Sequence, residues 1–282
     1  KITWHNSFGQ KRMHNMIADR GDWCISRQRL WGVPIPIIYN EDGSPIMELE
    51  VFNHIAELFG KYGSNYWFEH EAKDLLPEGY TNPKSPNGNF TKEKDIMDVW
   101  FDSGSSWNEL QARGYDYPCD LYFEGSDQYR GWFNSSLIVS TAVNGTAPYK
   151  EVLSHGYVVD SKGEKMSKSV GNVVNPMDII NVNGADVFRL WAMTSDFKED
   201  LKLGPSNIKQ VSDQYRKIRN TFRFLLGNIN ANDFDPKKDM VAYDDLTAVD
   251  QYILVKLNDV VKEVRKDCEE YDYVDTSKVL MN

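Results

Sequence analysis

DLYFEGSDQYRGWFNSSLIVSTAVNGTAPYKEVLSHGYVVD, residues 120–160, places two apolar runs on either side of a longer segment rich in small residues. We predict a strand at 120–125, a helix at 126–143, whose serines would let it pack closely on a sheet, and a second strand at 151–160 that Gly156 interrupts. A strand, a helix and a strand with short connections form the βαβ unit of a parallel sheet, with a right-handed crossover. The centre of the chain therefore predicts an α/β fold.

Polar residues of this stretch lie where the two predicted strands end. In open parallel sheets, ligands bind at the carboxyl ends of the strands. The residues that this rule places near a site are Glu124, Gly125, Asp127, Gln128 and His155. Glu124 and Asp127 would also suit a general acid/base pair, so the residue types alone leave the chemistry open.

A lysine-rich segment, GEKMSKSVGN at 163–172, follows the second strand directly. Lys165 and Lys168 can meet phosphate oxygens as point charges, and Ser167 and Ser169 can add hydrogen-bond donors. Glycines near both ends would let such a loop swing. Two interpretations stand: a solvated basic loop, or a mobile loop that closes over a triphosphate and stabilises charge in a transition state.

The segments before residue 120 are shorter and less regular. VPIPIIYN (33–40) predicts a short apolar strand. Residues 41–95 mix turn signals with one amphipathic helix near 51–62, and we expect them to form an insertion between core elements. DIMDVWFDSGSS (95–106) predicts a short strand followed by a Gly- and Ser-rich turn.

Helix signals dominate the C-terminal third of the chain. The predicted features are a start at Asn175-Pro176, a break at Asn183-Gly184, an apolar face that runs from Ile208 to Leu225, and a capping box from Thr247 to Asp250 that opens another long helix. Strand signals stop before these long helices. We therefore expect a domain boundary at Gly204-Pro205.

Composition and charge narrow the class of protein. Apolar residues make up 41% of the 282, which supplies a real core, and no apolar run approaches the ~18 residues of a membrane span. We expect a soluble, cytosolic protein with no membrane partner. The three cysteines are far apart and match neither a disulfide framework nor a familiar zinc site. They are Cys24, Cys119 and Cys268.

The net charge of −10 is unevenly distributed. Residues 40–98 hold 12 acidic and 5 basic side chains. Residues 209–223 hold 5 basic side chains and a single acidic one, Asp213. A polyanionic partner thus stays possible despite the acidic total, because distribution matters more than the sum.

Four ordered blocks resemble the class I aminoacyl-tRNA synthetases. KMSKS (165–169) is similar to the second motif of that family, and DWCISRQRLWGVPIP (22–36) to the segment where the chain returns to the catalytic domain after an editing insertion. DVWFDSGSS (98–106) and LYFEGSDQYRGWFNSSL (121–137) resemble the isoleucine-specific branch in particular. One five-residue motif would be weak evidence, but four blocks in this order are specific, and the resemblance covers the whole chain.

The resemblance implies half of a Rossmann-type parallel-sheet nucleotide-binding domain at 1–203, with an insertion at about 41–95. The beginning of a helical anticodon-binding domain would follow at 204–282. The family's first motif, His-x-Gly-His, does not occur here. We therefore expect this chain to be the second half of the catalytic domain of a longer protein, and to form no aminoacyl-adenylate by itself.

For the full-length protein, the resemblance implies ATP-dependent activation of L-isoleucine to isoleucyl-adenylate and transfer to an isoleucine-accepting tRNA in the cytoplasm. ATP would arrive with Mg²⁺, no zinc is expected in this segment, and the full-length enzyme would be a monomer. A pocket for isoleucine rejects a side chain that lacks one methylene by only about 1–3 kcal/mol, a range for which the isoleucine enzymes are themselves the standard example. An editing domain is accordingly expected elsewhere.

The family also implies roles for individual residues of the lysine segment. Lys168 would contact the ATP phosphates, and Lys165 would share that task or orient the loop. Ser167 would add to ATP binding. His155 would contact the adenosine portion, although a satisfied structural histidine is an open alternative.

For the aminoacyl-adenylate, Glu124 would be the main ligand, with Gly125, Asp127 and Gln128 lining the same site. No acid/base pair is needed, because the attacking carboxylate is already ionised. Trp132, and to a lesser extent Trp100, would wall the isoleucine side chain. Ordinary core packing is the alternative for both indoles.

Other basic residues keep two interpretations. Arg27 and Arg29 either approach tRNA or ATP or pack internally. The basic residues of the long helix either contact tRNA phosphates or form a solvated face; they are Arg216, Lys217, Arg219 and Arg223. At the level of the protein, the alternatives are a valine-specific synthetase and a non-catalytic tRNA-binding module. A small nucleotidyltransferase would not explain the long helices.

Overall fold

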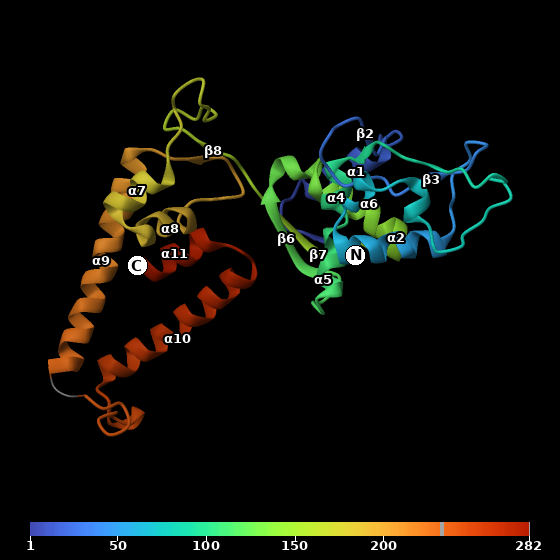
Figure 1. Cartoon of the computed structure of the whole chain (residues 1–282). Helices are drawn as coiled ribbons and strands as arrows, with labels where there is room; N and C mark the ends of the chain where they lie inside the picture. The colour runs from blue at the N-terminus through green and yellow to red at the C-terminus, as the bar shows by residue number, and fades with distance from the viewer. Residues whose placement is uncertain (232–233, 282) are drawn as a thin grey trace. The chain divides into compact units, whose positions relative to one another are not determined.

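The computed structural model describes residues 1–231 and 234–281, which form two compact units (Figure 1). Unit 1 comprises residues 1–123 and 127–153, and unit 2 comprises residues 124–126 and 154–282. Short strands and helices alternate in unit 1, whereas long helices dominate unit 2.

Up to the end of β7, the elements are β1 (Thr3–Trp4), α1 (Gly9–Ala18), β2 (Ser26–Arg27), β3 (Ile38–Tyr39), α2 (Leu49–Tyr62), α3 (Tyr66–Glu69), η1 (Ala72–Leu75), β4 (Thr91–Lys92), β5 (Ile96–Met97), α4 (Val99–Gly104), α5 (Ser106–Ala112), β6 (Cys119–Gly125), η2 (Ser126–Tyr129), α6 (Trp132–Asn144) and β7 (Tyr149–His155). The remaining elements are β8 (Val158–Val159), α7 (Pro176–Asn183), α8 (Ala185–Met193), β9 (Leu201–Lys202), α9 (Pro205–Ala231), η3 (Tyr243–Asp245), α10 (Ala248–Glu269) and α11 (Tyr273–Met281).

The central sheet has the strand order β1-β7-β6. β1 pairs with β7 in parallel, with Thr3 beside Glu151. The amide of Cys119, the first residue of β6, donates to the carbonyl of Pro148, which directly precedes β7, at 2.9 Å. β6 and β7 therefore begin at the same edge and run in the same direction. With α6 between them in sequence, they form the predicted βαβ unit, and the α/β fold class is confirmed.

Aromatic packing forms the core between this sheet and its helices. Tyr129, Phe133 and Tyr149 are almost fully buried, and the Tyr149 hydroxyl donates to the carbonyl of Phe133 at 3.0 Å. Gly9 on α1 allows Tyr129 to come close, since a Cβ there would lie 2.5 Å from the tyrosine hydroxyl. The sheet is thus joined to α1 and α6 by large rings, and α6 also buries the small side chains of Ser136 and Ser140.

The helix predicted at 126–143 begins six residues later than expected. Ser126–Tyr129 forms the 3-10 helix η2, and the α-helix α6 begins only at Trp132. Gly131 separates the two, and a Cβ there would lie 2.6 Å from both the Gln128 side chain and the Trp100 ring. Close tertiary packing at this glycine, which no local signal reveals, accompanies the break.

The turn predicted after the strand at 95–106 is wrong. β5 is present as expected, but the Gly- and Ser-rich residues that follow form the helices α4 and α5. The Asp98 side chain starts α4 by accepting the amide of Trp100. Gly104 then packs on α6, where a Cβ would lie 3.0 Å from the Ser135 backbone. Small residues that suggest a turn in isolation serve here as a helix–helix contact.

The insertion has a hydrophobic core of its own. Trp67 and Leu75 are completely buried in it, and the predicted helix near 51–62 is confirmed as α2. The strand predicted at 33–40 shrinks to β3, which pairs with β4 in antiparallel register. The prolines of that segment lack the amide hydrogen that a longer ladder needs.

The residues beyond the interruption predicted at Gly156 form β8, a strand of unit 2. The carbonyl of Glu199 comes so close to Gly156 that a Cβ there would lie 2.3 Å from it. The chain therefore leaves the central sheet at this glycine, and β8 instead pairs with β9 in parallel, with Val158 beside Leu201. The interruption predicted at Gly156 is confirmed, but the segment beyond it forms a separate strand in a second sheet rather than continuing the first one.

The helix starts predicted in the C-terminal third are confirmed. The Asn175 side chain accepts the amide of Met177 at the start of α7, and the Thr247 hydroxyl accepts the amide of Asp250 at the start of α10. Only the first turns of the apolar face on α9 are buried, whereas Phe222 is 60% exposed. Local capping signals thus located the helices, but not which apolar faces have a partner.

Strands end at Lys202 and α9 begins at Pro205. The division into compact units falls elsewhere, after Leu153, so the domain boundary at Gly204-Pro205 stays a prediction. Among the described residues, no helix is long and apolar enough to cross a membrane.

Candidate functional site

The lysine loop, residues 163–172, connects β8 to α7 and begins in a tight turn. The amide of Asp160 donates to the carbonyl of Glu164 at 2.9 Å, and the amide of Gly163 donates back to the carbonyl of Asp160 at 3.0 Å. Gly163 has a φ of 90°, a left-handed conformation that favours glycine. The turn brings Lys165 into an antiparallel bridge with Val159.

The Asp160 carboxylate holds this turn from one side. Its Oδ1 accepts the amides of Lys162 and Glu164, both at 2.9 Å, and its Oδ2 accepts the Asn172 side-chain amide at 2.9 Å. The hydrogen bond from Asn172, followed by the one from the Glu164 amide, keeps the pKa of this carboxyl below its ordinary value. Asp160 is therefore ionised at neutral pH and can bind the far end of the loop.

Asn172 closes the loop from the other side. Its Oδ1 accepts the amide of Ser167 at 2.9 Å, and its Nδ2 donates to the carbonyl of Lys165 at 3.2 Å as well as to Asp160. Neither Asp160 nor Asn172 was predicted as a functional residue. The available signal was a pair of Asx residues at the two ends of a Gly-containing segment, and such residues commonly bond nearby backbone.

The loop presents its two lysines to solvent. Lys165 and Lys168 are both exposed, and within the described part of the chain neither forms a salt bridge with a carboxylate. Met166, between them in sequence, packs against the core of unit 2. Ser167 and Ser169 lie with their hydroxyl oxygens 3.1 Å apart. An ordered turn thus carries two ammonium groups that are available to an anion.

Three further predicted residues lie at the carboxyl ends of β6 and β7. Glu124 is exposed, Gly125 is buried and His155 is half-buried. The His155 Nδ1 lies 2.8 Å from the carbonyl of Gly156, so this nitrogen carries the proton. The sheet edge that was expected to hold a ligand therefore does gather these residues.

In unit 1, a second group forms what we call the aromatic wall: Trp100, Tyr122, Gln128 and Trp132. Trp132 stacks on Tyr122, with ring centroids 3.9 Å apart and planes 10° from parallel. Its indole nitrogen donates to the carbonyl of Ser103 at 3.0 Å, and its amide donates to the Gln128 side chain at 2.9 Å. The Trp132 ring is therefore fixed by contacts at its face, its edge and its backbone.

Trp100 completes the wall while remaining 42% exposed. Its ring and the Gln128 side chain both lie against Gly131, and the Gln128 Nε2 donates to Asp127 at 3.1 Å. The structure thus brings four predicted residues together in unit 1: Trp100, Asp127, Gln128 and Trp132. The lysine loop, His155, Glu124 and Gly125 belong to unit 2.

The two interpretations of Arg27 are now distinguished. Its guanidinium lies 2.7 Å from the Asp98 carboxylate, so internal packing is the correct one for this arginine. Arg29 is exposed. On α9, Arg216 pairs with Asp213 at 3.1 Å, and the other predicted basic residues of this helix are exposed at its surface.

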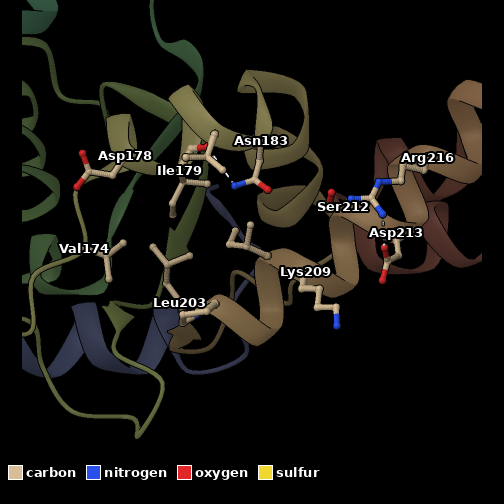
Figure 2. Close-up of a pocket in the computed structure, with 13 residues that line it drawn as sticks. Val174, Asp178, Ile179, Asn183, Leu203, Lys209, Ser212, Asp213 and Arg216 are labelled. Atoms are coloured by element: carbon tan, nitrogen blue, oxygen red, sulfur yellow. Dashed lines mark hydrogen bonds and ion pairs between the residues drawn. The ribbon is translucent and has the colours of Figure 1, made fainter.

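An apolar cavity of about 420 Å³ lies in unit 2 between α7 and the start of α9. Figure 2 shows it with Val174, Ile179 and Leu203 on its lining and with Lys209 and Arg216 farther along α9. None of the residues predicted for ATP or adenylate binding lines this cavity, whereas Arg216, a candidate tRNA contact, does. Among the described residues, no group of three or more His, Cys, Asp or Glu side chains is placed to hold a metal ion.

Comparison with known proteins gives a consistent result. The family model described as tRNA synthetases class I (I, L, M and V) matches residues 1–204. An isoleucine–tRNA ligase of Limosilactobacillus reuteri is 59% identical over 283 residues, which cover 100% of this chain and 30% of the relative. The isoleucine–tRNA ligase of Bacillus subtilis is 58% identical over 275 residues, or 97% of this chain and 30% of the relative.

Solved structures resemble the fold at lower sequence identity. The ternary complex of Agrobacterium radiobacter LeuRS with tRNA and LeuAMS matches with a TM-score of 0.71 and 21% identity, over 93% of this chain and 35% of that one. Mycobacterium tuberculosis methionyl-tRNA synthetase with methionyl-adenylate matches with a TM-score of 0.59 and 17% identity, over 99% and 46%. The chain spans about 30% of the length of the curated relatives it matches.

Proposed function

The chain belongs to the class I tRNA synthetases of the isoleucine, leucine, methionine and valine group, and we propose that it works as part of an isoleucine–tRNA ligase. The observation that carries this proposal is the pair of exposed lysines on a turn that Asp160 and Asn172 hold in shape. Such a turn suits a polyphosphate, and it lies within the segment that the family matches.

In the proposed reaction, the carboxylate of isoleucine attacks the α-phosphate of ATP. The bond between the α-phosphorus and the oxygen that bridges it to the β-phosphate breaks. Pyrophosphate leaves, and isoleucyl-adenylate remains. A hydroxyl of the 3′-terminal ribose of an isoleucine-accepting tRNA then attacks the acyl carbon, the bond from that carbon to the adenylate oxygen breaks, and AMP leaves. No covalent enzyme intermediate is required, so the protein acts by positioning the reactants and stabilising charge.

The lysine loop would stabilise the negative charge that gathers on the phosphates as pyrophosphate departs. Lys168 would contact the phosphates directly, and Lys165 would share that charge or orient the loop. Ser167 would donate a further hydrogen bond. Because neither lysine forms a salt bridge within the described chain, an incoming phosphate need not displace a carboxylate from these ammonium groups.

ATP would arrive with Mg²⁺ as part of the substrate. The described residues offer no cluster of metal-ligating side chains, so we assign no residue of this chain to Mg²⁺ and derive no step through it. His155 would face the adenosine portion, with its Nδ1 held by the carbonyl of Gly156.

The aromatic wall would form one side of the isoleucine pocket. Trp132 and Trp100 would contact the aliphatic side chain, since rigid indoles reject a wrong shape better than flexible side chains do. Glu124 would be the main polar ligand of the adenylate, and Gly125, Asp127 and Gln128 would line the same site.

The organisation of the longer protein is also part of this proposal. Residues 1–203 would complete the catalytic domain, and residues 204–282 would begin a helical anticodon-binding domain. The exposed basic face of α9 would contact tRNA phosphates. We propose a cytoplasmic enzyme that is monomeric at full length, in which this segment alone forms no adenylate.

Amino-acid-dependent ATP–pyrophosphate exchange by the full-length protein tests the proposal. Exchange that depends on isoleucine and proceeds at least about tenfold less efficiently with valine is the expected result. A preference for valine would identify the valine-specific alternative instead. Exchange with none of the branched amino acids, despite a folded protein that binds tRNA, would identify a non-catalytic tRNA-binding module.

A further inference from the structure

Asp98 is a buried acidic residue of unit 1, only 5% exposed. Its Oδ2 accepts two hydrogen bonds, from the guanidinium of Arg27 at 2.7 Å and from the indole nitrogen of Trp23 at 3.0 Å. Its Oδ1 accepts the backbone amide of Trp100 at 3.3 Å. We call Trp23, Arg27 and Asp98 the Asp98 clamp.

Backbone groups of residues 24–26 hold both charged members of the clamp, Arg27 and Asp98. A second nitrogen of Arg27 donates to the carbonyls of Cys24 and Ser26, each at 2.7 Å, so the guanidinium is oriented before it meets Asp98. The Asp98 amide donates to the carbonyl of Ile25 at 2.7 Å. A buried charge is costly unless it is paired and hydrogen-bonded, and here each oxygen of the carboxylate has a donor.

The clamp determines where α4 begins. Asp98 is its N-cap residue, and Trp100 lies in the first turn, with its own amide bound to the clamp. Phe101 packs on Trp23, with ring centroids 5.9 Å apart. The segment around residues 23–27 therefore fixes the start of α4 through a charge, a hydrogen bond and a ring contact.

The position of the Trp100 ring depends on where α4 begins. The ring fits against Gly131, where a Cβ would lie 2.6 Å away, so it can approach only along a narrow range of directions. On one side the ring meets α6, and on the other its backbone is held by the clamp. A displacement of the first turn of α4 must therefore displace the indole.

We propose that the Asp98 clamp positions Trp100 and thereby sets the discrimination between isoleucine and smaller aliphatic amino acids. The inference rests on the proposed function, because it takes Trp100 as a wall of the isoleucine pocket. A wall that tilts by a fraction of an ångström leaves a pocket that no longer separates side chains differing by one methylene. None of the clamp residues needs to touch the substrate; they act through Trp100.

The test measures kcat/KM for isoleucine and for valine in ATP–pyrophosphate exchange by the full-length protein. The ratio of the two values does not depend on how much of the enzyme is folded, so destabilisation alone leaves it unchanged. Asp98→Asn keeps the size and capping ability of the side chain but removes the charge that faces Arg27. We expect the ratio to fall about tenfold, mainly because KM for isoleucine rises.

A second variant, Trp23→Phe, removes only the indole donor while retaining a ring against Phe101. We expect its ratio to fall about threefold, and this variant decides the matter if Asp98→Asn does not fold. Glu109→Gln is the control, because Glu109 pairs with Arg113 at 2.5 Å in the same unit but on an exposed surface. Its ratio should equal that of the wild type.

Three outcomes are distinguishable. A ratio that falls in both clamp variants but not in the control supports the inference. Unchanged ratios in variants that have merely lost activity would show that the clamp is only structural, and would overturn it. A wild-type protein without isoleucine-dependent exchange would overturn the proposed function itself, and the inference with it.

Discussion

The lysine loop and the aromatic wall are held in shape by opposite means. In the loop, polar side chains at its two ends bond the backbone between them, and the functional groups point to solvent. In the wall, rings stack on rings and each nitrogen of Trp132 has a fixed acceptor. The loop contributes charge, and the wall contributes a surface.

The difference follows from what each region would recognise. A pocket that distinguishes side chains differing by one methylene must keep its shape, so close packing has to hold its residues in fixed positions. Ammonium groups that meet phosphates must stay ionised and reachable, so they belong on an exposed turn that hydrogen bonds can hold without burial. Substitutions in the wall should therefore change the choice of amino acid, and substitutions in the loop should change the chemical step.

The largest effect is expected from Lys168→Ala. Removing a group that stabilises developing charge typically costs about 10²–10³-fold in rate, so the rate of adenylate formation should fall by that amount. KM for isoleucine should change less than about threefold, because the lysine does not contact the amino acid. Single-turnover activation in the full-length protein measures both. Lys162→Ala, at an exposed lysine just before the same loop, is the control; an equal loss in both variants would contradict the role of Lys168.

Gly131→Ala, a substitution in the aromatic wall, should impair the use of isoleucine without changing the binding of ATP. The new Cβ would lie 2.6 Å from the Trp100 ring and from the Gln128 side chain, so both must move. We expect kcat/KM for isoleucine to fall about 10–100-fold while KM for ATP stays unchanged. Steady-state exchange kinetics at varied isoleucine and ATP check this. Gly60→Ala, where nothing lies within 4 Å of the added Cβ, should behave as the wild type.

A smaller effect is expected from Asn172→Ala. The variant loses the bonds to Asp160, to the amide of Ser167 and to the carbonyl of Lys165, so the lysines must be ordered by the substrate itself. Adenylate formation should slow about tenfold, with the isoleucine-to-valine ratio unchanged. Asn183→Ala is the matched control on α7. A changed ratio would mean that the loop and the wall are not separable as described.

The smallest effect concerns pH and Asp102, on α4 beside the wall. Burial, with an added contribution from the Asp98 carboxylate, raises the pKa of the Asp102 carboxyl. The folded protein thus holds this proton more tightly than the unfolded chain, and ionisation opposes folding as the pH rises above the unfolded pKa of about 4. Asp102→Asn should raise Tm at pH 7 by at most about 2 °C.

That gain should shrink as the pH falls towards 4 and vanish below about pH 3, where the wild-type carboxyl is protonated in both states. Thermal unfolding of the two proteins between about pH 7 and pH 3 measures the difference. Asp22→Asn, at an exposed aspartate, should show no comparable gain at pH 7. A gain that persists unchanged at low pH would rule out the electrostatic explanation.

Local signals in the sequence were sufficient for several elements. The strand at 120–125, the helix α2 and the caps at Asn175 and Thr247 were all predicted correctly. Each depends on residues that are neighbours in sequence: an apolar run, a helical period or a side chain bonded to an amide two or three residues on. The same is true of the family resemblance, which rests on contiguous blocks.

The errors share a physical cause. DSGSS was predicted as a turn because its residues favour turns in isolation, but Gly104 is needed where α4 meets α6. The helix at 126–143 was predicted without its break, which lies where Trp100 and Gln128 pack on Gly131. Arg27 kept two interpretations until its partner, 71 positions away, was located. In each case the deciding contact joins segments distant in sequence.

By itself, the sequence determined the fold class, the family and the segment that carries the exposed lysines, because each of these depends on patterns within short, contiguous runs of residues. Only the tertiary structure decided how Asp160 and Asn172 hold the lysine loop, how Trp132 is fixed on Tyr122 and which residues hold the start of α4. The reason is that hydrogen bonds and ring contacts act over a few ångströms of space, whatever the distance along the chain.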